Sequence, residues 1–374
     1  MDLRDLAPLY EAKGPFVTVV LDTTSEVEDA ATRLDINWRN TLRELEEKGV
    51  DEATREALSA NLGEHGEGNT RVLVAASGEV LLALSLPDPP ESQVVNVGPL
   101  PTLLALAERA SVQVPHVVAL VDRLGADVMA YGGSDPVPEE VLEVKGPQQH
   151  HIRKVHAGGW SSRRYEETAE NFWERNAEEV ASAVDGAAND VQAQLVVLAG
   201  DDRAVNLLQG ELPERLKPVT TVVQGTRHAD GGDPFTAQRI VDAVAERLKA
   251  VTDDLLAKYE QERAQNDKAV DGPADTLAAL RMAQVDVLVI TTQLPADATA
   301  WFDAEQPGVV GLSRDDVTGL GGQQPQEAPL VDVLLRAALG TGATVRVVSG
   351  DRPDAPQHGV GALLRFPVAD ETVA

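Results

Sequence analysis

Residues 154–173 read KVHAGGWSSRRYEETAENFW, and this stretch decides how the rest of the chain is interpreted. Its second half has the pattern of a helix, which we expect to begin near Glu166 and to stop at Gly186, a residue suited to the position after a helix end. Two glycines, a tryptophan, two serines and several cationic side chains come before that helix. The stretch therefore predicts a basic, glycine-containing loop that leads into a long helix.

The chain as a whole is strongly acidic. Its 374 residues carry 61 acidic against 32 basic side chains, which gives a formal net charge of −29. A charge of this sign disfavours general binding to DNA or to an anionic membrane, so any contact with RNA has to come from a local patch. Residues 144–165 hold five basic side chains and no acidic one, and they form such a patch.

The residue types in this patch suit a contact with RNA. Arginine binds phosphate oxygens, glycine lets the backbone approach closely, and a tryptophan stacks on a base. The alternative is an ordinary surface loop whose Trp160 packs back onto its own domain. Composition alone leaves both interpretations open.

Several other functional classes lack their signatures. Cysteine is absent, which excludes disulfides, thiolate metal sites and thiol nucleophiles. We find no phosphate-binding Walker loop, no H-E-x-x-H and no G-x-S-x-G. The N-terminus lacks the apolar core of a signal peptide, and no apolar run approaches the roughly 18–20 residues of a membrane span. We therefore expect a cytoplasmic protein that has no cofactor and makes no membrane contact.

Three histidines in the same region, His150, His151 and His156, raise the question of a metal site. The arginines and lysine around them repel a divalent metal, and no nearby carboxylate has the spacing of a metal ligand. We expect a polar loop here and no metal site.

Strands and helices alternate along the whole chain, which predicts an α/β protein. We place an N-terminal α/β domain at 1–113, a middle domain with the Gly-Gly-Trp loop at 114–265, and a C-terminal α/β domain at 266–374. Residues 134–148 read as a polar link, the residues between 291 and 328 as a long loop, and 359–367 as an edge strand. Clearer elements are strands at 15–22, 194–200, 219–223 and 285–291, hairpins at 70–87 and 116–133, and a helix at 234–265.

The middle domain resembles the central domain of the class-1 peptide release factors of eukaryotes and archaea, and of their Pelota relatives. In that family, two strands lead into a basic loop that ends in Gly-Gly-Gln and is followed at once by a long helix. Here residues 116–131 supply the strands and residues 157–165 the loop and helix start, while 222–235 looks like the family's second Gly-Gly segment. The ending at 359–367 and the layout look closer still to release-factor-like proteins of actinobacteria, whose best-known relative is the ribosome hibernation factor Balon.

This resemblance implies a release-factor/Pelota-like architecture with a central mixed-sheet domain and a C-terminal α/β (L7Ae-like) domain. It also implies a factor that occupies the vacant A site of the 70S ribosome in hibernation or stress silencing. The loop Gly158-Gly159-Trp160 would reach the peptidyl-transferase centre. The third domain would meet a translational GTPase such as elongation factor Tu. Contacts with ribosomal RNA would come from His151, Arg153, Lys154, His156, Ser161, Arg163 and Arg164.

The sequence departs from the family's pattern at Trp160, which stands where release factors have the glutamine that orders the attacking water. We therefore expect no catalytic residue and no enzymatic activity. The alternative is a peptidyl-tRNA hydrolase or rescue factor that works without the glutamine side chain. A weaker option, supported by the net charge, is a protein with this fold that has left the ribosome. A Gly-Gly-Gln triplet does occur at 321–323, but in a neutral loop, and we interpret it as coincidental.

Overall fold

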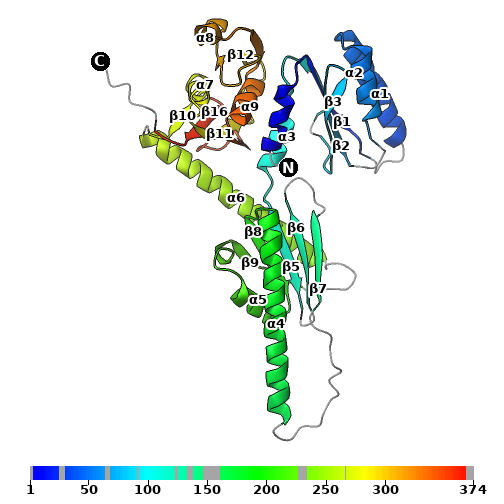
Figure 1. Cartoon of the computed structure of the whole chain (residues 1–374), viewed down its shortest axis with the longest axis vertical. Coiled ribbons are helices and arrows are strands. Elements are labelled where there is room, and N and C mark those ends of the chain that lie inside the picture. The colour runs from blue at the N-terminus through cyan, green and yellow to red at the C-terminus, as the bar shows by residue number, and fades with distance from the viewer. Residues whose placement is uncertain are drawn as a thin grey trace. The chain divides into compact units, whose positions relative to one another are not determined.

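The computed structural model describes most of the chain. The described residues are 3–24, 30–63, 68–90, 92–122, 125–132, 138–145, 161–225, 234–265 and 267–367. Their side chains are described too, except at 145 and 161–175. Contacts divide the chain into two compact units, one formed by residues 1–112 together with 252–374 and the other by residues 113–251. Figure 1 labels the elements of both units.

The N-terminal part of the first unit is an antiparallel sheet with the strand order β3-β2-β1-β4. Side chains alternate between the two faces of a strand. Val17 and Val19 of β1 therefore pack with α1 and α2, whereas Phe16 and Val20 share an apolar cluster with η1 and α3. The elements are η1 (Leu3–Glu11), β1 (Phe16–Asp22), α1 (Ala30–Glu47), α2 (Glu52–Ala60), β2 (Thr70–Ala76), β3 (Glu79–Leu86), β4 (Val94–Gly98) and α3 (Leu104–Ser111).

The C-terminal part of the first unit holds two more sheets. In the larger one, ordered β10-β16-β11-β15, β11 and β15 run parallel and β16 is antiparallel to both of its neighbours. The smaller one is antiparallel, with the order β13-β12-β14. The elements are β10 (Ala269–Asp271), α7 (Pro273–Arg281), β11 (Val285–Thr291), β12 (Thr299–Asp303), β13 (Val310–Gly311), α8 (Arg314–Gly319), β14 (Pro325–Pro329), α9 (Leu330–Gly340), β15 (Thr344–Val348) and β16 (Val360–Leu364).

These two parts of the first unit share one hydrophobic core. The 3-10 helix η1 packs on α9, and α3 packs on β15, so that Leu6, Leu106 and Leu334 belong to the same buried cluster. The hydroxyl of Ser111 accepts a hydrogen bond from the backbone N–H of Val347 at 2.7 Å, although 236 positions separate the two residues. The first and last parts of the chain therefore form one folded unit. The division into three domains, and the L7Ae-like character of the last part, remain predictions.

The second unit is a mixed sheet with the order β7-β6-β5-β8-β9 and helices on both faces. Helices α4 and α5 cover one face, and the first part of α6 covers the other through Ile240, Ala243 and Leu248. The elements are β5 (His116–Val121), β6 (Gly125–Tyr131), β7 (Glu140–Lys145), α4 (Ser161–Asp190), β8 (Leu195–Gly200), α5 (Asp202–Glu211), η2 (Lys217–Val219), β9 (Thr220–Val222) and α6 (Pro234–Gln265).

The α/β class and the mixed central sheet agree with the sequence-based expectation. The strands expected at 15–22, 194–200, 219–223 and 285–291 correspond to β1, β8, β9 and β11. The two expected hairpins are β2–β3 and β5–β6. The helix expected at 234–265 has the same bounds as α6.

Five expectations are wrong. The polar link at 134–148 contains β7, and the loop expected between 291 and 328 contains β12, β13, α8 and β14. Helix α4 begins at Ser161 instead of Glu166, and it continues through Gly186 because that residue lies on an exposed side of the helix where no side chain is needed for packing. Strand β16 is not at an edge, since it pairs with β10 on one side and β11 on the other.

Gly200 offers a test of the second unit's sheet. It ends β8 with a φ of 137°, and an added Cβ would lie 1.8 Å from the carbonyl oxygen of Val121 at the end of β5. Gly200→Ala should therefore lower the free energy of unfolding by about 3 kcal/mol or more, measured by urea unfolding followed by circular dichroism. Gly210→Ala in α5 is the matched control. Its Cβ would meet nothing within 4 Å, and we expect a gain of about 0.5–1 kcal/mol. Equal effects of the two variants would contradict this geometry.

Candidate functional site

The loop predicted to be functional, residues 146–160, lies outside the described residues. Gly158, Gly159, Trp160, His151, Arg153, Lys154 and His156 all belong to it. Ser161, Arg163 and Arg164 begin α4, where the backbone is described and the side chains are not. The two elements that flank the predicted loop in the chain, β7 and α4, are described.

Strand β7 ends at the same edge of the sheet as β5 and β8. Because β5 and β8 run parallel, their last residues, Val121 and Gly200, lie side by side in register. Lys145, the last residue of β7, stands opposite Gly125 at the turn of the β5–β6 hairpin. We call the edge of the sheet at which β5, β7 and β8 end the carboxyl edge. The last described residue before the predicted loop, Lys145, therefore lies at this edge.

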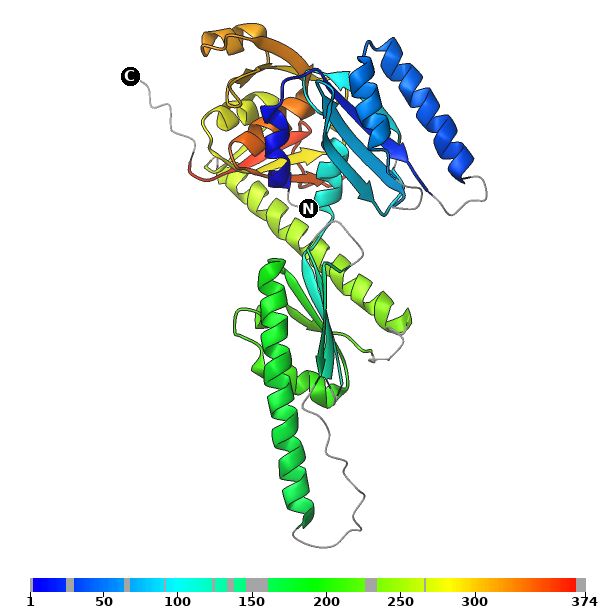
Figure 2. The ribbon, with the colours of Figure 1, turned by 45° about the vertical axis from the view of Figure 1, so that its right-hand side comes forward.

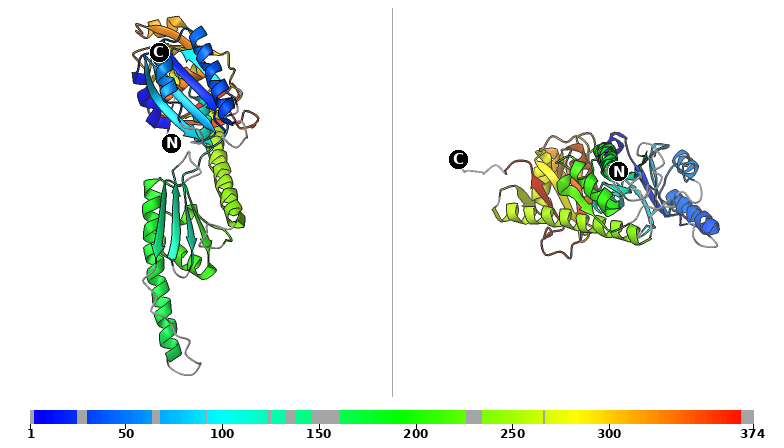
Figure 3. Two further views of the ribbon diagram at one scale, coloured as in Figure 1. Left: turned by 90° about the vertical axis from the view of Figure 1, so that its right-hand side faces the viewer. Right: turned by 90° about the horizontal axis from the view of Figure 1, so that it is seen from below.

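Helix α4 returns to the carboxyl edge from beyond the sheet. Asn176 of α4 lines a pocket at this edge, and fifteen residues of the helix precede it, starting at Ser161. At 1.5 Å per residue they extend about 22 Å. The ribbon shows this half of α4 running past the sheet (Figures 2 and 3). We call residues 161–175 the stalk. The predicted loop comes directly before the stalk in the chain.

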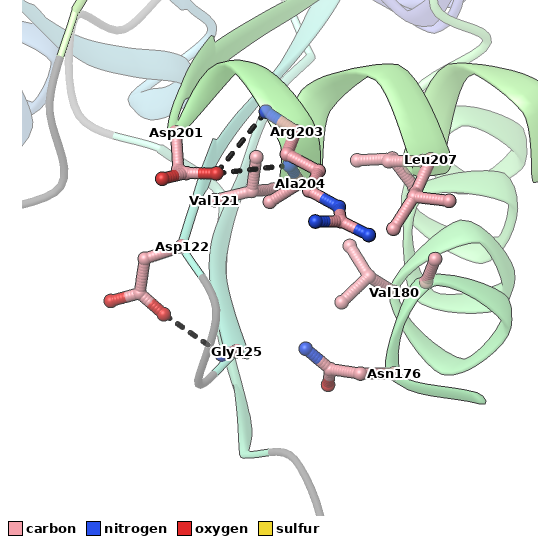
Figure 4. A pocket seen from close by; sticks show the side chains of 11 residues that line it. Val121, Asp122, Gly125, Asn176, Val180, Asp201, Arg203, Ala204 and Leu207 are labelled. Atoms are coloured by element: carbon pink, nitrogen blue, oxygen red, sulfur yellow. Dashed lines mark hydrogen bonds between the residues drawn. The ribbon is translucent and has the colours of Figure 1, made fainter. Parts of the chain in front are cut away.

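The pocket at the carboxyl edge lies between α4 and α5 (Figure 4). Two carboxylates there hold backbone groups in place. The Asp201 carboxylate accepts the backbone N–H groups of Arg203 and Ala204 at 3.1 and 3.2 Å and so caps α5. The Asp122 carboxylate accepts the N–H of Gly125 at 3.0 Å. Both carboxylates therefore fix the chain where β5 and β8 end.

Asn176 and Arg203 project into this pocket (Figure 4). Asn176 is only 6% exposed, and its side-chain oxygen finds no hydrogen-bond partner among the described residues. The volume is about 20 Å³, which is room for a single water molecule. A water that donates to Asn176 would satisfy this oxygen. The pocket is suited to such a structural water and is too small for a substrate.

Sequence reasoning missed this pocket, although one signal could have found part of it. Asp122 and Asp201 each follow a buried strand, and polar residues after parallel strands converge at one edge of a sheet. Asn176 carries no comparable signal. A single polar residue in a helix reveals its burial only when the packing of the helix is known.

The Gly-Gly-Gln triplet at 321–323 is a turn that follows α8. Gly321 has a φ of 88°, and the N–H of Gly322 donates to the carbonyl oxygen of Val317 at 2.9 Å. A Cβ on Gly322 would lie 2.6 Å from a methyl group of Val317. The side-chain amide of Gln323 donates to the carbonyl of Gly321 at 3.0 Å. Local structure accounts for the glycines and for the position of the glutamine.

The described residues contain neither a metal-binding cluster nor a membrane-spanning helix. Within the described ranges, no cluster of three or more His, Asp or Glu side chains could hold a metal ion. His150, His151 and His156 lie outside those ranges. His116, at the start of β5, stacks on Tyr131 at 4.6 Å between ring centroids, and burial lowers the pKa of its imidazole. Of the helices in the described part of the chain, none is long and apolar enough to cross a membrane.

Comparison with known proteins finds a family match for the second unit. Residues 115–265 match the family described as Bacterial archaeo-eukaryotic release factor family 2. The match includes the whole sheet of the second unit, the predicted loop, the stalk and α6. This part of the chain is similar to a bacterial release-factor-like family. The narrower relation to Balon stays a prediction.

Relatives also match along the whole chain. An uncharacterized protein of Mycobacterium tuberculosis, present in two strains, is 26% identical over 369 residues, which cover 96% of this chain and 95% of the relative. The archaeal translation termination factor aRF1 is 18% identical with a TM-score of 0.28, over 98% of this chain and 99% of that one. Dom34 of S. cerevisiae, a translation termination-like factor, is 12% identical with a TM-score of 0.41, over 99% and 94%. Superpositions with TM-scores this low carry no functional argument.

The segment around the Gly-Gly-Gln triplet depends on Asp303, whose side chain is 1% exposed. Its carboxylate accepts the backbone N–H groups of Glu305, Gln306 and Gln324 at 2.9, 3.1 and 2.8 Å. Burial alone would raise the pKa of Asp303. The backbone hydrogen bonds outweigh burial and hold this pKa below its ordinary value.

Asp303→Asn should therefore lower the free energy of unfolding by about 2–4 kcal/mol at pH 7, since the amide accepts at only one atom and brings its N–H groups against donors. A lowered pKa in the folded state stabilises the fold above the ordinary carboxyl pKa, and this contribution is lost as the pH falls through the folded value. In urea unfolding, the difference in the free energy of unfolding between wild type and variant should thus become smaller below about pH 4. Asp315→Asn, on the exposed side of α8, is the control. A gap that does not change with pH would count against the role of the Asp303 charge.

Proposed function

We propose that the chain is a ribosome-binding translation factor of the release-factor/Pelota type. It enters the vacant A site of the 70S ribosome, with Gly158, Gly159 and Trp160 at the peptidyl-transferase centre, and acts in ribosome hibernation or stress silencing. The family match over residues 115–265 supports the coarser part of this proposal, a translation factor that works with the ribosome.

The observation that carries the proposal is the stalk. Fifteen residues of α4 precede its contact with the carboxyl edge. The predicted loop is therefore attached about 22 Å beyond that edge. This reach suits a loop that enters a narrow, RNA-walled site while the folded body stays outside. A loop that only connected β7 to a packed helix would not need it.

The distribution of charge along the predicted loop and the stalk also suits a contact with RNA. Residues 144–165 carry five basic side chains and no acidic one. The stalk then continues with Glu166, Glu167, Glu170 and Glu174. Phosphates attract the first group and repel the second. Contact with RNA would thus be confined to the predicted loop and the first turn of α4, and the net charge of −29 would repel RNA from the rest of the chain.

Trp160 favours a non-enzymatic role. An indole cannot order a water for attack on the peptidyl ester as the family's glutamine does. The alternative function, peptidyl-tRNA hydrolysis in release or rescue, retains one supporting feature, because the backbone N–H of residue 160 is present with any side chain. A delivery partner such as elongation factor Tu stays an expectation from the resemblance, since no described residue supports a particular GTPase contact.

The cations at the start of α4 give the first functional prediction. Replacing both Arg163 and Arg164 by glutamine should weaken co-sedimentation with 70S ribosomes. It should also reduce the slope of log affinity against log salt by up to about one unit for each lost phosphate contact. The matched control replaces Arg239 and Lys249, two exposed cations of α6, by glutamine. If both double variants lose the same affinity, the effect is one of net charge and the predicted loop is not the contact.

Trp160 gives the second functional prediction. Trp160→Ala should cost about 1–3 kcal/mol of ribosome binding if the indole stacks on a base. Trp160→Gln restores the family's triplet, so it should release some peptide from ribosomes carrying peptidyl-tRNA, whereas the wild type should release none. The matched control is Gln323→Ala, which removes the glutamine of the other triplet and should change nothing. Efficient peptide release by the wild-type protein would overturn the non-enzymatic proposal.

A further inference from the structure

The first unit contains a cleft that the proposed function does not use. Its volume is about 770 Å³, within the range of small-molecule sites. The lining comes from α1, β4 and the start of α3 on one side, and from the end of β11 and the start of α9 on the other. Residues from the N-terminal and C-terminal parts of the unit therefore form it together.

The cleft lies where α/β proteins commonly bind ligands. Thr291, which lines it, is the last residue of β11, and β11 runs parallel to β15. Ligands tend to bind outside the carboxyl ends of parallel strands, because the connections diverge there. A second cavity of about 520 Å³ shares Thr291, Leu294 and Pro295 with the first and is also lined by Gly350, two residues after β15 ends. The two cavities therefore share part of their wall at this edge.

A chain of hydrogen bonds runs along the wall of the cleft and ends in an unsatisfied group. The amide of Asn96 donates to the hydroxyl of Thr102 at 2.7 Å, and this hydroxyl donates to Oδ2 of Asp332 at 3.3 Å. All three residues line the cleft. Asp332 is 1% exposed, and its other oxygen, Oδ1, has no hydrogen-bond partner among the described residues. Leaving a buried acceptor unsatisfied costs about 1–3 kcal/mol, which a donor placed in the cleft would recover.

The charges around the cleft select the kind of donor. Its lining contains two carboxylates, Asp332 and Glu44, and no lysine or arginine. Glu44 already pairs with Lys48 at 2.8 Å, whereas Asp332, the other acid of this lining, has no ion pair among the described residues. An anion such as a phosphate would find no positive partner in this lining. Val94, Leu104 and Ile290 contribute apolar surface to the same lining.

We infer that the cleft binds a small organic cation, a primary ammonium group on an apolar body, with the ammonium donating to the carboxylate of Asp332. The apolar body would lie against the aliphatic part of the lining. This site is independent of the ribosome-binding proposal, since all of its residues belong to the first unit.

Proton binding should compete with the cation. Burial raises the pKa of Asp332 to about 7. Tyr10 of η1, whose hydroxyl also has no hydrogen-bond partner among the described residues, interacts electrostatically with Asp332 and with Arg336 of α9. Glu44 of α1 is the other acid that lines the cleft. Arg336 donates to the carbonyl of Ala304 at 3.0 Å and lies over the ring of Phe302, so it does not pair with Asp332. The carboxyl group is mostly neutral at pH 6 and mostly ionised at pH 8, and the cation should bind about tenfold more tightly at pH 8.

Calorimetric titration of the full chain with n-butylammonium, in phosphate buffer free of other amines, tests this inference. We expect saturable binding in the millimolar range at pH 8 and about tenfold weaker binding at pH 6. The isosteres n-butanol and butyrate should bind much more weakly, because they lack the cation. This comparison uses the wild-type protein alone and does not depend on how any variant folds.

Asp332→Asn should weaken n-butylammonium binding by at least about tenfold and remove its dependence on pH. The matched control is Asp275→Asn, at an exposed position in the first turn of α7, and it should bind as the wild type does. The inference is overturned if n-butanol binds as well as the ammonium, if Asp332→Asn binds normally, or if n-butylammonium shows no saturable binding at pH 8.

Discussion

The parallel pairing of β5 with β8 is the constraint on which the second unit depends. Parallel neighbours need a crossover connection, and here β6, β7, the predicted loop and α4 provide it. Returning along a six-residue strand requires about 20 Å of helix, whereas the thirty residues of α4 span about 45 Å. Val180, Val184 and Ala188 bury the half of α4 that the crossover needs. The other half is in excess of what the crossover requires.

The same pairing explains what could be predicted from sequence. Buried strands such as β8 are continuous apolar runs, and the β2–β3 turn is visible because Ser77 and Gly78 suit the positive φ angles found there. The predictions that were wrong concern elements whose formation depends on residues far away in the sequence. Strand β14 begins and ends with proline, and nothing in Pro325–Pro329 indicates a strand. Proline is tolerated in this strand because β14 pairs only with β12 and lies at a sheet edge, where a missing N–H costs little.

The two candidate sites also differ in whether the sequence alone reveals them. The predicted loop stands out in the sequence because its lack of acidic residues contrasts with the rest of the chain. Asp332 does not stand out, because an acid in the first turn of a helix is ordinary. Its burial and its hydrogen bond depend on Thr102, which is 230 positions away. Polar groups of this kind also make the contact between the two parts of the first unit specific, because apolar packing alone tolerates more than one arrangement.

The discontinuity of the first unit has a consequence for synthesis on the ribosome. The second unit is encoded without interruption between residues 113 and 251, so it can fold as soon as it emerges. The N-terminal part emerges earlier, with its sheet covered on one face by α1 and α2 and on the other by η1 and α3. The outward sides of η1 and α3 have no partner until α9 and β15 are made. At about 5–20 residues per second, more than two hundred further residues take at least ten seconds or so. During that time the nascent chain exposes apolar surface, which makes it a natural client for chaperones that bind near the exit tunnel.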